Sequence, residues 1–148
     1  DHLIKRGYEK PKPERTDGLF NSYDYLHERL NSKNKIFRAN IYDPLPEEIG
    51  EFDVAVFGTM LSHVMDPIRT LMNILYKVND YAILINHFQR KPTSYMSGKN
   101  VWWNISQSDI MKIMLDMGFK TEKLTMVYPR NNLIGENREY KSILFKRC

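Results

Sequence analysis

The segment 52–86 restricts the possible folds most, because it combines two apolar strands with a helix between them. Residues 52–57 are nearly all apolar and β-branched or aromatic, which is typical of a central strand covered on both faces. Asp66 and Pro67 supply an N-cap and a first-turn proline for the helix, and residues 81–86 form a second apolar run. The helix has an apolar stripe at i, i+3, i+4 and i+7, made of Ile68, Leu71, Met72 and Leu75. This spacing predicts a right-handed parallel crossover in an α/β sheet.

Upstream of this crossover the pattern predicts a helix and a further strand. Residues 1–20 hold prolines, glycines and dense mixed charge without a sustained period, and predict an irregular segment. Asn21 is placed to cap a helix that ends near residues 31–34. Its expected shared face consists of Tyr23, Leu26, His27 and Leu30. Residues 35–42 then alternate in the manner of a strand, before a turn at Asp43-Pro44.

Downstream, a long connection leads to one helix and two final strands. The connection spans residues 86–105. Ser106 is placed to cap a helix that Gly118 ends, and Ile110, Ile113, Met114 and Met117 are expected on its buried face. Strands are expected over residues 119–128 and 140–146. We therefore expect helices on both faces of the sheet and an antiparallel strand pair at one edge.

Composition and charge exclude several function classes. The single cysteine, Cys148, allows neither an intrachain disulfide nor a thiolate metal cluster, and the four histidines lack the spacing of a helical zinc site. Apolar stretches are far shorter than the roughly 20 residues that cross a bilayer, and no signal peptide opens the chain, so we expect a cytoplasmic protein. A formal net charge of +4 allows nucleic-acid binding without indicating it.

Ligands of open α/β sheets bind beyond the carboxyl ends of the strands, which directs attention to the residues just after them. Gly58 either lets a ligand approach the backbone or is a simple turn glycine. His63 is either a surface histidine or a general base or substrate contact. Trp102 and Trp103 either form an aromatic wall over a ligand or pack within the domain.

Two longer stretches carry a resemblance to a known family. ANIYDPLPEEIGEFDVAVFGTMLSHVMDPIRTLMNIL and VWWNISQSDIMKIMLDMGF resemble the class I S-adenosylmethionine-dependent methyltransferases, in particular relatives of the tRNA uridine-34 carboxymethyl-transferring enzymes. The likeness covers about residues 21–146. It implies a Rossmann-like sheet of order 3-2-1-4-5-7-6. The segment 35–42 would be its third strand, residues 52–57 its fourth and residues 81–86 its fifth, and the last two strands its sixth and seventh.

The resemblance also implies S-adenosylmethionine as cofactor and a set of residues around it. Asn40 and Ile41, with Tyr42 close by, correspond to the adenine side, and the amide oxygen of Asn40 can accept from an adenine amino group. Asp1 corresponds to the carboxylate that pairs with the ribose. The loop along the methionine part of the cofactor corresponds to Gly58, Thr59 and Met60. His63 is the candidate on the acceptor side.

The chain departs from the family because no G-x-G pattern precedes Asn40 and the first two strands have no counterpart. We therefore expect a carboxyl-terminal part of a methyltransferase, inactive by itself, whose fourth strand lacks a neighbour. The leading hypothesis is methyl transfer to a small-molecule acceptor. The alternatives are modification of tRNA or another RNA, and a non-catalytic α/β binding module of the same fold. The sequence does not determine the acceptor or the oligomeric state, and it predicts no metal and no membrane partner.

Overall fold

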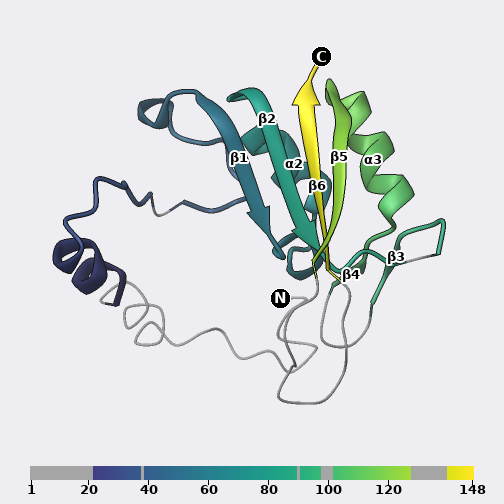
Figure 1. Ribbon diagram of the computed structural model, residues 1–148, viewed down its shortest axis with the longest axis horizontal. Helices are drawn as coiled ribbons and strands as arrows, with labels where there is room; N and C mark the ends of the chain where they lie inside the picture. Colours follow the sequence, from purple (N-terminus) through teal and green to yellow (C-terminus); the bar gives the residue numbers. More distant parts are fainter. Residues whose placement is uncertain (1–21, 38, 90, 98–101, 128–139) are drawn as a thin grey trace. The chain divides into compact units, whose positions relative to one another are not determined.

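A computed structural model describes residues 22–37, 39–89, 91–97, 102–127 and 140–148 (Figure 1). The chain divides into two compact units, Asp1–Arg38 and Ala39–Cys148. The described part of the first unit contains a helix over residues 22–29, in which the rings of Tyr23 and His27 stack with centroids 5.4 Å apart. That contact matches the predicted helix face, whereas Leu26 and Leu30 are exposed. The predicted cap Asn21 and the segment 1–20 lie outside the described residues.

The second unit is built on a four-stranded sheet of order β1-β2-β6-β5 (Figure 1). Its strands are β1 (Phe52–Gly58), β2 (Val78–Asn86), β5 (Phe119–Val127) and β6 (Tyr140–Arg147). β1 and β2 are parallel, and β6 runs antiparallel to both of its neighbours. The parallel crossover, the antiparallel pair and the order of these four strands are confirmed.

Two capped helices connect the strands at the predicted places. Helix α2 spans Pro67–Leu75, and the carboxylate of Asp66 accepts a hydrogen bond from the backbone N–H of Arg69 at 2.9 Å. Helix α3 spans Gln107–Asp116, and the Ser106 hydroxyl accepts from the backbone N–H three residues later at 3.4 Å. Gly118 follows α3 with a φ of 82°, a conformation that glycine adopts without steric cost.

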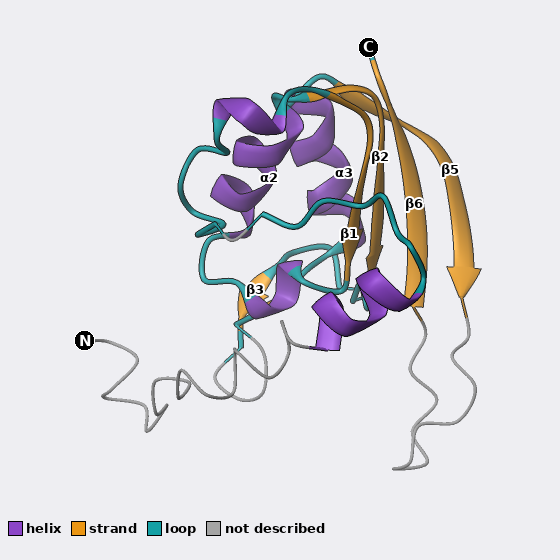
Figure 2. Cartoon of the chain, turned by 90° about the vertical axis from the view of Figure 1, so that its left-hand side faces the viewer, coloured by secondary structure: helices purple, strands orange, loops and turns teal. Residues whose placement is uncertain are grey.

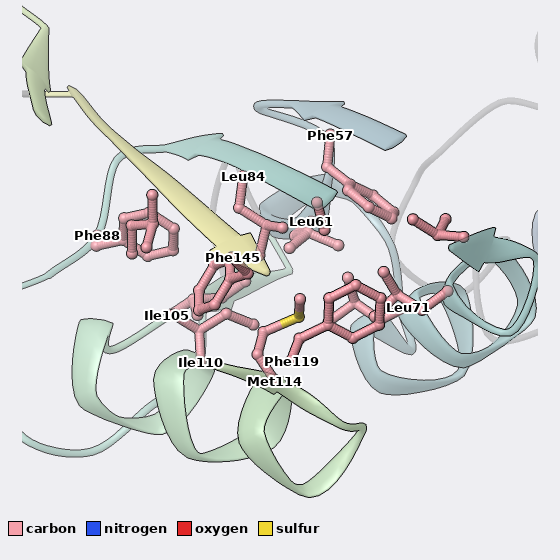
Figure 3. Close-up of a cluster of buried hydrophobic side chains, with 14 residues drawn as sticks. Phe57, Leu61, Leu71, Leu84, Phe88, Ile105, Ile110, Met114, Phe119 and Phe145 are labelled. Atoms are coloured by element: carbon pink, nitrogen blue, oxygen red, sulfur yellow. The ribbon is translucent and has the colours of Figure 1, made fainter. Parts of the chain in front are cut away.

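The hydrophobic core lies between the sheet and these two helices. Figure 2 shows α2 and α3 on the same face of the sheet, so the expectation of helices on both faces is wrong for the described residues of the second unit. Alternate residues of the strands point to this face, as the pleat requires, and meet one stripe from each helix (Figure 3). The fully buried members include Leu71, Ala82, Leu84, Met114, Phe119, Ile143 and Phe145.

The opposite face of β1 corrects the prediction of a central strand covered on both faces. β1 is an edge strand of the described sheet, and Val54 and Val56 are 46% and 63% exposed. An apolar run indicates that a strand prefers to be buried, but it does not identify the element that buries it. A central strand covered on both faces and an edge strand with one exposed face can therefore have the same sequence pattern.

The apolar stripe predicted for α2 is only half buried. Leu71 and Leu75 are buried, whereas Ile68 and Met72 are 47% and 58% exposed. Thr70 is fully buried in their place, and its hydroxyl donates to the carbonyl of Asp66 at 3.0 Å. Because that bond satisfies the hydroxyl, the helix can turn Thr70 toward the core.

The strand predicted over residues 35–42 is wrong. The described residues of this segment, 35–37 and 39–42, form no strand, and residues 40–43 form a turn in which Asp43 N–H donates to the carbonyl of Asn40 at 3.0 Å. A strand is stable only beside a partner that completes its ladder, and alternation cannot supply that partner. The third-strand assignment is therefore also wrong for this structure.

The carboxyl end of β6 is fastened to the junction of α2 and β2. The guanidinium of Arg147 donates to the carbonyls of Val78 and Leu75, both at 2.6 Å. Its central carbon also lies 4.6 Å from the ring centroid of Phe119. These contacts connect the last strand to the end of α2 and to both of its neighbours in the sheet, β2 and β5. Among the described helices none has the length and apolar character needed to cross a bilayer.

Candidate functional site

The carboxyl end of β1 presents exposed backbone in an uncommon conformation. A Cβ placed on Gly58 would meet no atom within 4 Å, so open space adjoins this part of the chain. Thr59 has a φ of 54°, in the left-handed region that β-branched residues rarely enter. Its N–H donates to the carbonyl of Ile85 in β2 at 2.7 Å. Strained residues of this kind cluster at ligand sites, which makes this position a candidate.

A buried hydrogen-bonded pair fixes the loop that follows. The short 3-10 helix η3 (Leu61–His63) includes Ser62, whose hydroxyl donates to the amide oxygen of Asn86 at 3.2 Å and accepts from its NH₂ group at 2.9 Å. Both side chains are buried, 8% and 3% exposed. The end of β2 therefore holds the loop that begins at Met60, and the Ser62 hydroxyl is engaged in positioning.

Met60 and His63 occupy opposite ends of this loop. The Met60 side chain is half-buried and packs against the hydrophobic core, and its carbonyl accepts from the N–H of His63 at 2.8 Å. His63 is exposed. A solvent-accessible imidazole at a sheet edge can accept a proton from a ligand or contact it, which are the two roles expected on the acceptor side.

The turn of residues 40–43 is attached to the same loop and to α2. The Tyr42 hydroxyl accepts from the backbone N–H of Met65 at 2.7 Å, and the carbonyl of Ile41 accepts from the Asn73 side chain at 3.0 Å. The Asn40 amide oxygen accepts from the N–H of Tyr42 at 3.2 Å. An amide oxygen has two lone pairs, so Asn40 retains capacity for a second donor. The predicted adenine-side residues thus lie in a turn rather than after a strand.

The connection from β2 to α3 contains a small hairpin that contacts the loop from its other side. Its strands are β3 (Tyr95–Met96) and β4 (Trp103–Asn104). The indole N–H of Trp103 donates to the carbonyl of Met65 at 2.9 Å, and the backbone N–H of Trp102 donates to the carbonyl of Ser62 at 2.8 Å. Trp103 also packs against the core, which favours the packing interpretation for this residue.

The hairpin segment is joined to the start of α3 by Ser94. Its hydroxyl accepts from the N–H of Ser106, and its own N–H donates to the carboxylate of Asp109 at 2.5 Å. Hydrogen bonds from the side chain and backbone of Ser94 lower the pKa of Asp109 below its ordinary value of 3.8, and Lys112 adds a smaller effect.

Of the sequence-predicted residues, the structure brings two groups to one loop. Gly58, Thr59, Met60 and His63 are contiguous with it, and Tyr42 reaches it by a hydrogen bond. Asp1 lies outside the described residues. In the described ranges no three histidine, cysteine, aspartate or glutamate side chains gather as metal ligands.

Sequence reasoning missed the Ser62–Asn86 pair and the attachment of Trp103 to Met65. Asn86 carried a signal, because an amide at the end of an otherwise apolar buried strand requires a partner. Nothing in the local sequence identifies Ser62 as that partner, since 24 residues separate the two.

Comparison with known proteins shows the fold. A 1,6-didemethyltoxoflavin-N1-methyltransferase from Burkholderia thailandensis, solved with 1,6-didemethyltoxoflavin and S-adenosylhomocysteine, superposes with a TM-score of 0.65 at 14% identity. It matches 84% of this chain and 56% of its own. The magnesium protoporphyrin IX methyltransferase from Synechocystis PCC 6803 with bound SAH gives a TM-score of 0.62 at 15% identity, over 85% and 57% of the two chains.

A SAM-dependent methyltransferase from Methanosarcina mazei gives a TM-score of 0.56 at 12% identity, over 78% of this chain and 70% of that one. No protein-family model and no curated protein sequence matches the chain. The chain spans about half the length of the toxoflavin and porphyrin enzymes, 56% and 57%. Its fold is the Rossmann-like α/β fold of these methyltransferases, with an antiparallel strand pair at the carboxyl-terminal edge.

Proposed function

We propose that this chain forms part of an S-adenosylmethionine-dependent methyltransferase that acts on a small molecule. The observation that carries the proposal is the carboxyl end of β1, where exposed Gly58 and left-handed Thr59 precede a loop fixed by Ser62 and Asn86. Solved structures of the same fold bind S-adenosylhomocysteine, and one of them also holds its small-molecule substrate. Both facts support the assignment.

The residues at this end of the sheet suit the cofactor that we propose. Adenine needs a hydrogen-bond acceptor for its amino group, and the amide oxygen of Asn40 has this capacity beside Ile41 and Tyr42. The open space at Gly58 admits the methionine part against backbone, with Thr59 and Met60 next in the chain. When bound, S-adenosylmethionine supplies a methyl group on a positively charged sulfur. The residues named here would hold and orient it, and alignment accounts for much of the acceleration in such a transfer.

We assign His63 to the acceptor side of this site. It is exposed at the end of η3, and its position is set by the Ser62–Asn86 pair next to it. Its imidazole would take a proton from the acceptor or form a wall of the site. In either role, replacement of His63 by alanine should leave the affinity for S-adenosylmethionine unchanged.

The test is a titration of the ¹⁵N-labelled 148-residue chain with S-adenosylmethionine, followed by two-dimensional NMR. We expect weak, saturable binding with shifts concentrated at residues 40–42 and 58–60, because the glycine-rich loop of the family has no counterpart here. Asn40→Leu removes an acceptor and should weaken binding by about 1 to 3 kcal/mol, or roughly 5- to 150-fold.

Asn79→Leu is the matched control, since Asn79 is exposed at the opposite end of β2 and should not change the affinity. Shifts located elsewhere, or equal affinities of Asn40→Leu and the unmodified chain, would remove the adenine assignment. A dissociation constant in the low-micromolar range would instead show that this chain holds a complete site.

A further inference from the structure

An apolar cavity of about 340 Å³ lies between the start of α2, the α3 helix and the β3–β4 hairpin. Its walls include Met65, Ile68, Trp103, Ile110 and Ile113. Protein interiors are close-packed and contain few voids larger than a water molecule. An apolar cavity of roughly 150 Å³ already binds a benzene-sized molecule, and small-molecule pockets begin at about 300 Å³. The size therefore suits a compact organic ligand.

Most of the walls consist of apolar side chains, and each polar side chain in them already makes a hydrogen bond within the protein. The carboxylate of Asp66 caps α2 through the N–H of Arg69, and Ser94 bonds to both Ser106 and Asp109. The indole N–H of Trp103 donates to the carbonyl of Met65. A ligand with many polar groups would lose its hydrogen bonds to water on entering the cavity and would gain few from the walls, which costs free energy. The cavity thus selects for apolar surface.

Two apolar side chains in the walls are exposed to solvent. Met65 is 42% and Ile68 is 47% exposed, although both line the cavity. A ligand that entered would cover them and gain from the burial of apolar area. Met65 belongs to the loop that carries His63, so an occupant of the cavity contacts this loop.

We propose that this cavity is a binding site for a neutral, compact, largely apolar molecule such as an aromatic ring system. The proposal rests on the cavity and its lining, and does not depend on methyl transfer. It is distinct from the turn of residues 40–43 and from the backbone at Gly58, since neither forms part of the walls.

The test uses N-phenyl-1-naphthylamine, a neutral aromatic dye whose fluorescence rises in apolar surroundings, with the full 148-residue chain. We expect saturable binding at one site. Ile68→Glu places a carboxylate at the cavity, in the first turn of α2 where the helix dipole tolerates it, and should weaken binding at least about tenfold. Met72→Glu is the matched control, because it adds the same charge one helical turn later, at an exposed residue outside the cavity walls. Its dissociation constant for the dye should stay within about twofold of that of the unmodified chain.

A second measurement does not depend on any substitution. The chain has two tryptophans, so its NMR spectrum contains two indole N–H signals, and Trp103→Phe identifies the one that lines the cavity. The dye should shift this signal.

Absence of saturable binding, equal binding by Ile68→Glu and the unmodified chain, or an unmoved Trp103 signal would each overturn the proposal. Loss of binding in Val56→Glu would also overturn it, because that result locates the dye on the exposed face of β1.

Discussion

Replacement of Asn86 by alanine should destabilise the protein, because its amide makes two buried hydrogen bonds. The Ser62 hydroxyl contacts the amide oxygen at 3.2 Å and the amide nitrogen at 2.9 Å, and Asn86 is 3% exposed. A buried hydrogen bond contributes about 1 kcal/mol net, and a buried hydroxyl left without its partner costs a further amount of that order. We therefore expect the free energy of unfolding to fall by about 2 to 3 kcal/mol.

The assay is urea denaturation followed by circular dichroism, with thermal unfolding as a second readout. For a chain of this size the loss corresponds to a decrease in Tm of about 4 to 12 °C. Asn79→Ala is the matched control on the same strand, because Asn79 is exposed and its amide donates to the exposed carboxylate of Glu51 at 3.2 Å. It should change the free energy of unfolding by less than about 0.5 kcal/mol.

A double-mutant cycle with Ser62→Ala isolates the pair. If the two side chains stabilise the fold through each other, the double variant should be more stable than the sum of the single changes predicts, by about 1 kcal/mol or more. A coupling energy near zero, or an Asn86→Ala variant as stable as the unmodified protein, would refute the reasoning. The loop from Met60 to His63 would then be held by its other contacts.

Two further predictions concern the strained residue and the ionised group near the site. In urea denaturation, Thr59→Gly should raise the free energy of unfolding by about 0.5 to 1 kcal/mol. This value is the cost of the left-handed backbone, which glycine avoids, less the extra chain entropy that glycine loses on folding. Thr59→Ala should give no such gain. Because Ser94 lowers the pKa of Asp109, the ionised carboxylate of Asp109 stabilises the folded state above pH 3.8. The unmodified protein should therefore be more stable than the Asp109→Asn variant, and this difference should shrink as the pH falls below 3.8. An advantage that stays constant between pH 7 and pH 2.5 would contradict this assignment.

The strands β1, β2, β5 and β6 and the helices α2 and α3 were predictable because their signals are local, whereas the β3–β4 hairpin was not predicted. Asp66-Pro67 and Ser106 mark helix starts by the chemistry of their own side chains, and the apolar runs at 52–57 and 81–86 mark strands by composition. The resemblance to methyltransferases supplied the strand order, which periodicity alone leaves open. The structure confirms the part of that order that concerns the last four strands, the fourth, fifth, seventh and sixth.

The errors have a common physical cause, which is the absence of a partner from the local pattern. Residues 35–42 alternate in sequence, but those that the structure describes pair with no described strand. Val56 belongs to an apolar run, yet it is exposed among the described residues of the second unit. Ile68 and Met72 fit a helical stripe, but packing buries Thr70 instead. The burial or pairing of each of these residues depends on long-range contacts, and so does the hydrogen bond between Ser62 and Asn86.

The position of β6 between β2 and β5 determines when the sheet can assemble. β5 contacts the rest of the sheet through β6 alone among the described strands, and the pairing of Tyr81 with Lys146 joins residues far apart in the chain. During synthesis β1, β2 and α2 emerge first and β5 must wait for its neighbour, so late closure of this long contact should limit the folding rate. A nascent chain arrested before Tyr140 would expose the antiparallel edges of both β2 and β5, and chaperone binding at this stage would protect them from aggregation.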